Sequence, residues 1–90
     1  MYILVQHSIS DPANFVKRAE ELNTKIPPGV TLHHVFSAPD GTKAVCLWEA
    51  KSVTAVKDLL EPELGKFGRN DYFEVPNKEG ITLPKFTVTA

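Results

Sequence analysis

The stretch LHHVFSAPDGTKAVCLWE, from Leu32 to Glu49, contains two extended runs with a turn signal between them. Pro39 suits the second position of a type I turn, and Asp40 suits the third. Gly41 can adopt the left-handed conformation that closes a three-residue loop with a bulge. The stretch therefore predicts a β-hairpin with strands over residues 30–37 and 42–50.

The segment before the hairpin predicts a strand followed by an amphipathic helix. Residues 2–5, YILV, are apolar and partly β-branched, which is typical of a strand in a covered sheet. Asp11 can cap a helix that has Pro12 at its first position. The apolar residues that recur at helical spacing are Phe15, Ala19, Leu22 and Ile26. The helix is expected to end before the Pro-Pro-Gly sequence at residues 27–29.

The segment after the hairpin predicts a second helix, which Ser52 can cap, and a fourth strand over residues 71–75, DYFEV. Pro62 is expected to end this helix or to restart it for one turn. The order β-α-β-β-α-β predicts a ferredoxin-like α+β domain over residues 1–76, with a four-stranded antiparallel sheet and both helices on one face. Residues 77–90 are expected to form an extended tail, packed on or exchanged with a partner chain.

Composition excludes several classes of protein. With 90 residues, the chain is expected to form one domain. Its 10 basic and 11 acidic residues give a formal net charge of -1 without a basic run, so we expect no nucleic-acid partner. A single cysteine allows no internal disulfide, and neither a secretory signal nor a membrane-spanning run is evident. A cytoplasmic location is therefore expected.

A three-residue hairpin loop sets which side chains share a face of the sheet. In that register the facing pairs are Phe36 with Ala44, His34 with Cys46, and Leu32 with Trp48. A two-residue loop would instead place His33 with the cysteine and the tryptophan. The residues expected to face the helices include Val35, Val45 and Leu47. Those expected on the open face are Leu32, His34, Phe36, Cys46 and Trp48.

Such an apolar open face is seldom left in water. Either a second copy or the C-terminal tail would have to cover it, and we expect a homodimer in which two sheets meet face to face, as in a dimeric α/β barrel. A gap left between them would form a pocket for a small ligand. The residues expected to line this pocket are Gln6, Leu32, Phe36, Trp48 and Tyr72.

His34 opposite Cys46 would place an imidazole and a thiol about 5 Å apart at their Cβ atoms, which suits zinc, nickel or copper. Further ligands would have to come from the first strand, the fourth strand or the partner chain. The candidates within the chain are Gln6, His7, Asp71, Tyr72 and Glu74. The alternative is a hydrogen-bonded histidine beside a cysteine that packs as a small apolar side chain.

Two catalytic hypotheses use the same residues. Cys46 could be a nucleophile that His34 activates, or His34 could be the acid or base of an enzyme acting on a small aromatic or polyketide-like substrate. In the second case Phe36 and Trp48 would form the pocket walls. No nucleophile elbow, phosphate-binding loop or metalloprotease motif is present.

Two other histidines are expected to have structural roles. His33 and Glu49 should pair at the rim of the sheet on the helix side. His7 should lie in water at the end of the first strand, although a register error of one residue would turn it inward.

The segments PPGVTLHHVFSAPDG, AVCLWEAKSVTAV and NDYFEV resemble a family of small bacterial dimeric α/β-barrel proteins of unknown function, one member of which binds and responds to nickel. The resemblance implies a ferredoxin-like fold, a homodimer and metal ligands at His34 and Cys46. The chain departs from the family pattern at Gln6 and Lys57, where that pattern has histidines. Dimeric α/β barrels also resemble the scaffold of cofactor-independent monooxygenases and isomerases, so the fold alone does not decide the activity.

Overall fold

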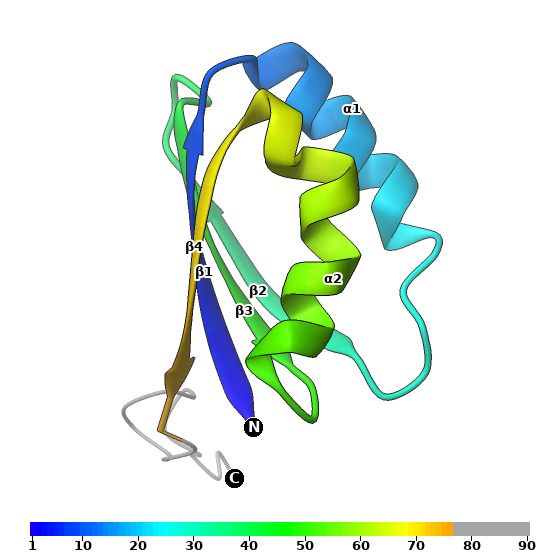
Figure 1. Cartoon of the computed structure of the whole chain (residues 1–90). Coiled ribbons are helices and arrows are strands. Elements are labelled where there is room, and N and C mark those ends of the chain that lie inside the picture. Colours follow the sequence, from blue (N-terminus) through cyan, green and yellow to red (C-terminus); the bar gives the residue numbers. More distant parts are fainter. Residues whose placement is uncertain (77–90) are drawn as a thin grey trace, which may run out of the picture.

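The computed structural model describes residues 1–76, in which four strands and two helices follow one another in the expected order (Figure 1). The strands are β1 (Tyr2–Ile9), β2 (Thr31–Ser37), β3 (Lys43–Glu49) and β4 (Gly68–Val75). The helices are α1 (Pro12–Asn23) and α2 (Val53–Leu64), and a 3₁₀ turn, η1 (Gly65–Phe67), leads from α2 into β4. The predicted tail over residues 77–90 lies outside the described residues.

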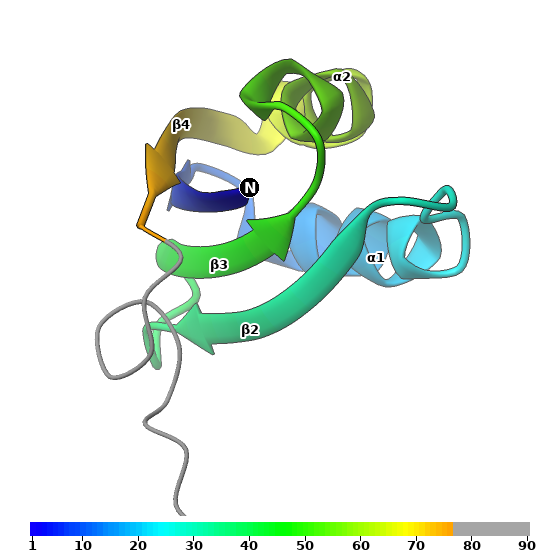
Figure 2. The same cartoon turned by 90° about the horizontal axis from the view of Figure 1, so that it is seen from below.

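The strands form one antiparallel sheet in the order β2-β3-β1-β4, and both helices lie against the same face (Figures 1 and 2). The two strands at the centre, β1 and β3, are therefore far apart in the sequence. This topology confirms the predicted ferredoxin-like α+β domain.

Both helices begin at the predicted caps. The Asp11 carboxylate accepts a hydrogen bond from the backbone N–H of Asn14, and the Ser52 hydroxyl accepts one from the backbone N–H of Ala55. Each cap satisfies a backbone donor that the first helical turn leaves free. Neither helix is long and apolar enough to cross a membrane within the part of the chain described.

The core lies between the sheet and the helices. Its fully buried side chains come from the central strand β1 and from α2, namely Ile3, Val5, Val56 and Leu60. Around them pack Phe15 and Leu22 of α1 and Cys46 and Trp48 of β3. The layer between helices and sheet therefore contains the cysteine and the tryptophan that were expected on the open face.

The loop between β2 and β3 has four residues, from Pro39 to Thr42, so the predicted three-residue loop was wrong. The Asp40 carboxylate accepts hydrogen bonds from the backbone N–H of Thr42 at 3.0 Å and from its hydroxyl at 2.7 Å. These bonds hold Thr42 in the loop. The backbone N–H of Ala38 donates to the Lys43 carbonyl, so Ala38 and Lys43 are the residues that pair on either side of the loop. Gly41 has a φ of 75°, as its predicted left-handed role requires.

The extra loop residue shifts the pairing of β2 with β3 by one position. The observed partners are Phe36 with Val45, Val35 with Cys46, and His34 with Leu47. The predicted pairs Phe36 with Ala44 and His34 with Cys46 are therefore wrong. An irregularity at His33 then absorbs one residue of β2, so Leu32 does lie opposite Trp48, as predicted.

The shift reverses the predicted faces of β3. Because side chains alternate along a strand, Ala44, Cys46 and Trp48 face the helices together, while Val45 and Leu47 face the open side. On β2, His34 and Phe36 keep the open face predicted for them. His34 and Cys46 consequently lie on opposite sides of the sheet.

Candidate functional site

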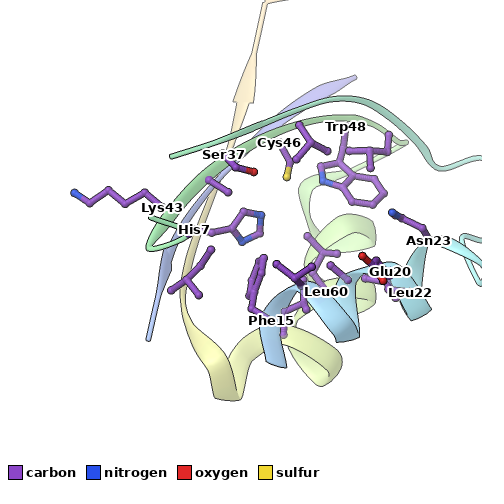
Figure 3. Close-up of a pocket in the computed structure, with 18 residues that line it drawn as sticks. His7, Phe15, Glu20, Leu22, Asn23, Ser37, Lys43, Cys46, Trp48 and Leu60 are labelled. Atoms are coloured by element: carbon purple, nitrogen blue, oxygen red, sulfur yellow. The ribbon is translucent and has the colours of Figure 1, made fainter. Parts of the chain in front are cut away.

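A cavity of about 230 Å³ lies between the sheet and the helices, mainly under α1 (Figure 3). Its walls come from β1, β2, β3, α1 and α2 and are largely apolar. Exposed polar residues line it as well, namely Glu20, Asn23, Ser37 and Lys43. The buried polar atoms of the lining belong to His7, Cys46 and Trp48. An apolar cavity with a few polar groups is the usual form of a small-molecule site.

His7 is buried in the helix-facing layer, with only 3% of its surface exposed, so its predicted place in water was wrong. Its ring meets the Phe15 ring edge-on, with 5.1 Å between centroids. The signal for this placement was present in the sequence. Ile3, Val5 and His7 occupy alternate positions of β1, so the histidine continues the buried face of the strand.

A chain of side chains extends from His7 toward α2 and β4. The Nδ1 atom of His7 lies 2.6 Å from Oδ1 of Asn70, its partner on β4. The Asn70 amide nitrogen donates to Oε2 of Glu61 at 2.7 Å, and the Tyr72 hydroxyl donates to the same oxygen at 2.8 Å. Glu61 lies on α2, so the chain connects the helix layer to the central strand.

The strand β4 reaches His7 because it begins at a residue without a side chain. A Cβ atom at Gly68 would overlap the Ser8 carbonyl oxygen and lie 2.9 Å from the Ile9 Cα. The missing Cβ allows β4 to lie against β1 from its first residue, with Asn70 opposite His7. The position of the polar chain thus depends on this close backbone approach.

Burial shifts the pKa values of three groups in this region. It lowers the pKa of His7, although the Asn70 hydrogen bond and the Glu61 charge oppose the shift, so the imidazole is neutral at pH 7. It raises the pKa of Tyr72, as does the hydrogen bond to Glu61. It also raises the pKa of Cys46 to about 11. Cys46 is therefore a neutral thiol, which is neither the nucleophilic form nor the metal-binding form.

Trp48 lines the cavity and carries an unsatisfied donor. The side chain is 3% exposed, and its indole N–H has no hydrogen-bond partner among residues 1–76. Figure 3 shows the indole nitrogen at the end of the ring that faces Cys46. A buried donor without an acceptor costs roughly 1–3 kcal/mol. The atom is sealed from solvent in this structure.

The predicted metal pair is not brought together. His34 is half-buried on the open face, where its ring stacks on Phe36 with 5.8 Å between centroids. Cys46 lies in the core on the other side of the sheet. Residues 1–76 contain no group of three or more His, Cys, Asp or Glu side chains that could hold a metal ion. Binding of nickel or zinc stays a prediction. Because His34 and Cys46 lie on opposite faces of the sheet, they cannot bind one metal ion together.

The predicted pocket residues divide between the two faces. Leu32 and Trp48 line the cavity under the helices. Gln6 and Phe36 are exposed on the open face, in line with Val45. Tyr72 pairs with Val5 on the helix side, and its hydroxyl is bound to Glu61 instead of lining the cavity.

His33 does bond to Glu49, at 2.9 Å from its Nε2 atom, as the sequence predicted. The pair lies on the open face, however, because the His33 ring contacts Tyr2 at 5.4 Å between centroids. Tyr2 precedes the inward-facing Ile3 and so points to the other side of the sheet. The predicted helix-side position of this pair was wrong.

No protein-family model and no curated protein sequence matches the chain. Among solved structures, the structure of Rv0793 from Mycobacterium tuberculosis is similar, with a TM-score of 0.50 and 12% sequence identity. The similarity covers 88% of this chain and 97% of that one. The shared feature is the ferredoxin-like α+β fold. At this identity the similarity extends to the fold alone.

Acidification is expected to destabilise the protein through His7. Because burial lowers the pKa of His7 in the folded protein, the unfolded chain takes up this proton first as the pH falls below the ordinary value of 6.5. The free energy of unfolding should therefore decrease below that pH. Urea unfolding at about pH 7.5 and about pH 5.5 measures the effect, and His7→Gln should show a smaller decrease than the wild type. Equal decreases would contradict the burial of a neutral His7.

Proposed function

We propose that this protein binds a small, largely apolar molecule in the cavity between the sheet and the helices. The observation that carries the proposal is the largely apolar cavity of about 230 Å³, which has the buried polar side chains of His7 and Trp48 in its wall. The apolar surface of a ligand would be removed from water against these walls.

The size of the cavity defines the size of the ligand. A cavity of about 150 Å³ lined by apolar side chains is known to hold benzene. The volume of about 230 Å³ found here therefore suits a compact molecule of one or two rings. The exposed polar residues of the lining, such as Glu20 and Lys43, place one side of the cavity in contact with solvent, which gives a ligand a way in.

Filling the cavity should abolish binding without unfolding the protein. The probe is 1-indanone, a two-ring ketone, followed by calorimetry and by the rise in melting temperature that binding to the folded form produces. Ala19→Phe introduces a ring at the cavity wall, whereas Ala13→Phe introduces the same ring at an exposed position of the same helix. We expect the Ala19 variant to lose binding and the Ala13 variant to keep it. Equal binding by both variants, or no binding by the wild type, would refute the proposal.

We also propose that a second copy of the chain covers the open face of the sheet. Phe36 is 65% exposed on β2, and Phe73 is 43% exposed on β4. Both side chains lie on the open face, one near each edge. Large apolar groups at these positions are typical of a surface that another protein covers. A homodimer formed sheet to sheet would bury both of them twice.

A charge on the open face should separate the two copies. In sedimentation experiments we expect the wild type to be dimeric and Phe36→Glu to be monomeric, because the dimer would bury an unpaired carboxylate. Val16→Glu, at an exposed apolar residue of α1, is the control and should remain dimeric. A monomeric wild type would contradict this proposal.

An enzyme is the alternative function, namely a cofactor-independent monooxygenase or isomerase that acts on a small aromatic or polyketide-like substrate. The base predicted for it, His34, lies on the open face, away from the cavity. His7 lines the cavity and is a neutral imidazole at pH 7. The observation that favours the alternative is therefore the position of His7.

A further inference from the structure

We propose that His7 and Cys46 form a two-coordinate site for a soft monovalent metal ion, of which Cu(I) is the physiological example. The ion binds the imidazole through Nε2 and the thiolate through Sγ. Asn70 and Glu61 are positioning residues that orient the imidazole. The site does not need the apolar ligand proposed above, so either proposal can fail without the other.

The sheet register makes His7 and Cys46 neighbours on the helix-facing side of the sheet. His7 lies opposite Ala44 and Val5 lies opposite Cys46, so the histidine and the cysteine are diagonal neighbours on β1 and β3. Cβ atoms in diagonal positions are at most about 7–8 Å apart, which long side chains can bridge. Both side chains line the cavity, and in Figure 3 the sulfur points from β3 into the layer that contains the His7 ring.

The polar chain determines which ring nitrogen of His7 can bind an ion. The Glu61 carboxylate can only accept, so it must face the amide nitrogen of Asn70, as observed at 2.7 Å. The Oδ1 atom of Asn70 is then the one that faces Nδ1 of His7, at 2.6 Å, and this oxygen can also only accept. The proton of the neutral imidazole therefore lies on Nδ1, and Nε2 carries a lone pair.

This lone pair points to a ligand independently of the cysteine. His7 is only 3% exposed, and its Nε2 atom makes no hydrogen bond with any residue of the described range. Unlike the indole nitrogen of Trp48, Nε2 is not sealed from its surroundings. A histidine that binds a metal through one nitrogen typically donates its other N–H to an oxygen, as His7 does to Asn70.

The two ligand atoms select the kind of ion. Within residues 1–76 no group of three or more His, Cys, Asp or Glu side chains is placed to hold a metal, whereas zinc and nickel take four or more ligands. Thiolates select soft ions such as Cu(I), which is stable with two ligands in a line. A monovalent ion and a thiolate together are neutral, which suits the largely apolar cavity. A divalent ion would leave a net positive charge there.

Binding exchanges the thiol proton for the ion. Burial keeps Cys46 protonated, so the S–H bond breaks as the sulfur–metal bond forms, and one proton passes to solvent. The oxidation state of the ion and of the sulfur does not change. An ion adsorbed by the exposed imidazoles alone would release no such proton.

The wild-type protein can be tested with Ag(I), which shares the charge and the ligand preference of Cu(I) and needs no reductant. One equivalent is added in chloride-free buffer at about pH 7.5 and followed by ¹⁵N NMR of the histidine rings and by calorimetry in two buffers. We expect one ion per chain, release of about one proton, and a shift of the His7 Nε2 signal with His33 and His34 unchanged. Absence of stoichiometric binding, or saturation that leaves the His7 signals unchanged, would overturn the inference.

The residue roles can be tested with Cu(I) in anaerobic competition with a chelator. Cys46→Ser and His7→Phe should each lower the affinity at least about 100-fold, and Asn70→Leu should lower it about tenfold. Glu61→Gln should keep the affinity, because the glutamine oxygen can still accept from Asn70. The control is His34→Ala, on the open face, which should bind as the wild type does.

Two results with these proteins would contradict the site. Binding by Cys46→Ser that equals binding by the wild type would show that the ion lies elsewhere. Displacement of Cu(I) by an equal concentration of Zn(II) would show that the site offers more than two ligands.

Discussion

The hydrogen bonds from Thr42 to the Asp40 carboxylate determine which face of β3 is buried. They lengthen the hairpin loop by one residue, and one residue exchanges the two faces of a strand. Cys46 and Trp48 are buried under the helices for this reason, and His34 faces the opposite side. The presence of Cys46 and Trp48 in the cavity wall is thus linked to turn geometry.

The two halves of the helix-facing layer have different chemistry. Under α2, the chain through Asn70, Glu61 and Tyr72 satisfies its own hydrogen bonds. Under α1, the layer contains a cavity and an indole donor that has no acceptor within the described part of the chain. His7 lies between the halves on the central strand and belongs to both.

The element order, the helix caps and the fold class could be predicted because short segments such as Asp11-Pro12 and Ser52 determine them locally. The register between β2 and β3 could not be predicted, since three-residue and four-residue loops use similar residues. The two loops differ here by the hydrogen bonds that Asp40 accepts. His7 was missed although it continues the alternation of Ile3 and Val5. Its partners Asn70 and Glu61 are distant in sequence, so only the folded chain brings them to it.

The measurement that tests this account most directly is a set of NMR distance contacts between β2 and β3 and around His7. The account predicts backbone contacts that pair Val35 with Cys46, together with contacts between the rings of His7 and Phe15. Backbone contacts that pair His34 with Cys46 would contradict it, because that pairing would place both residues on one face of the sheet.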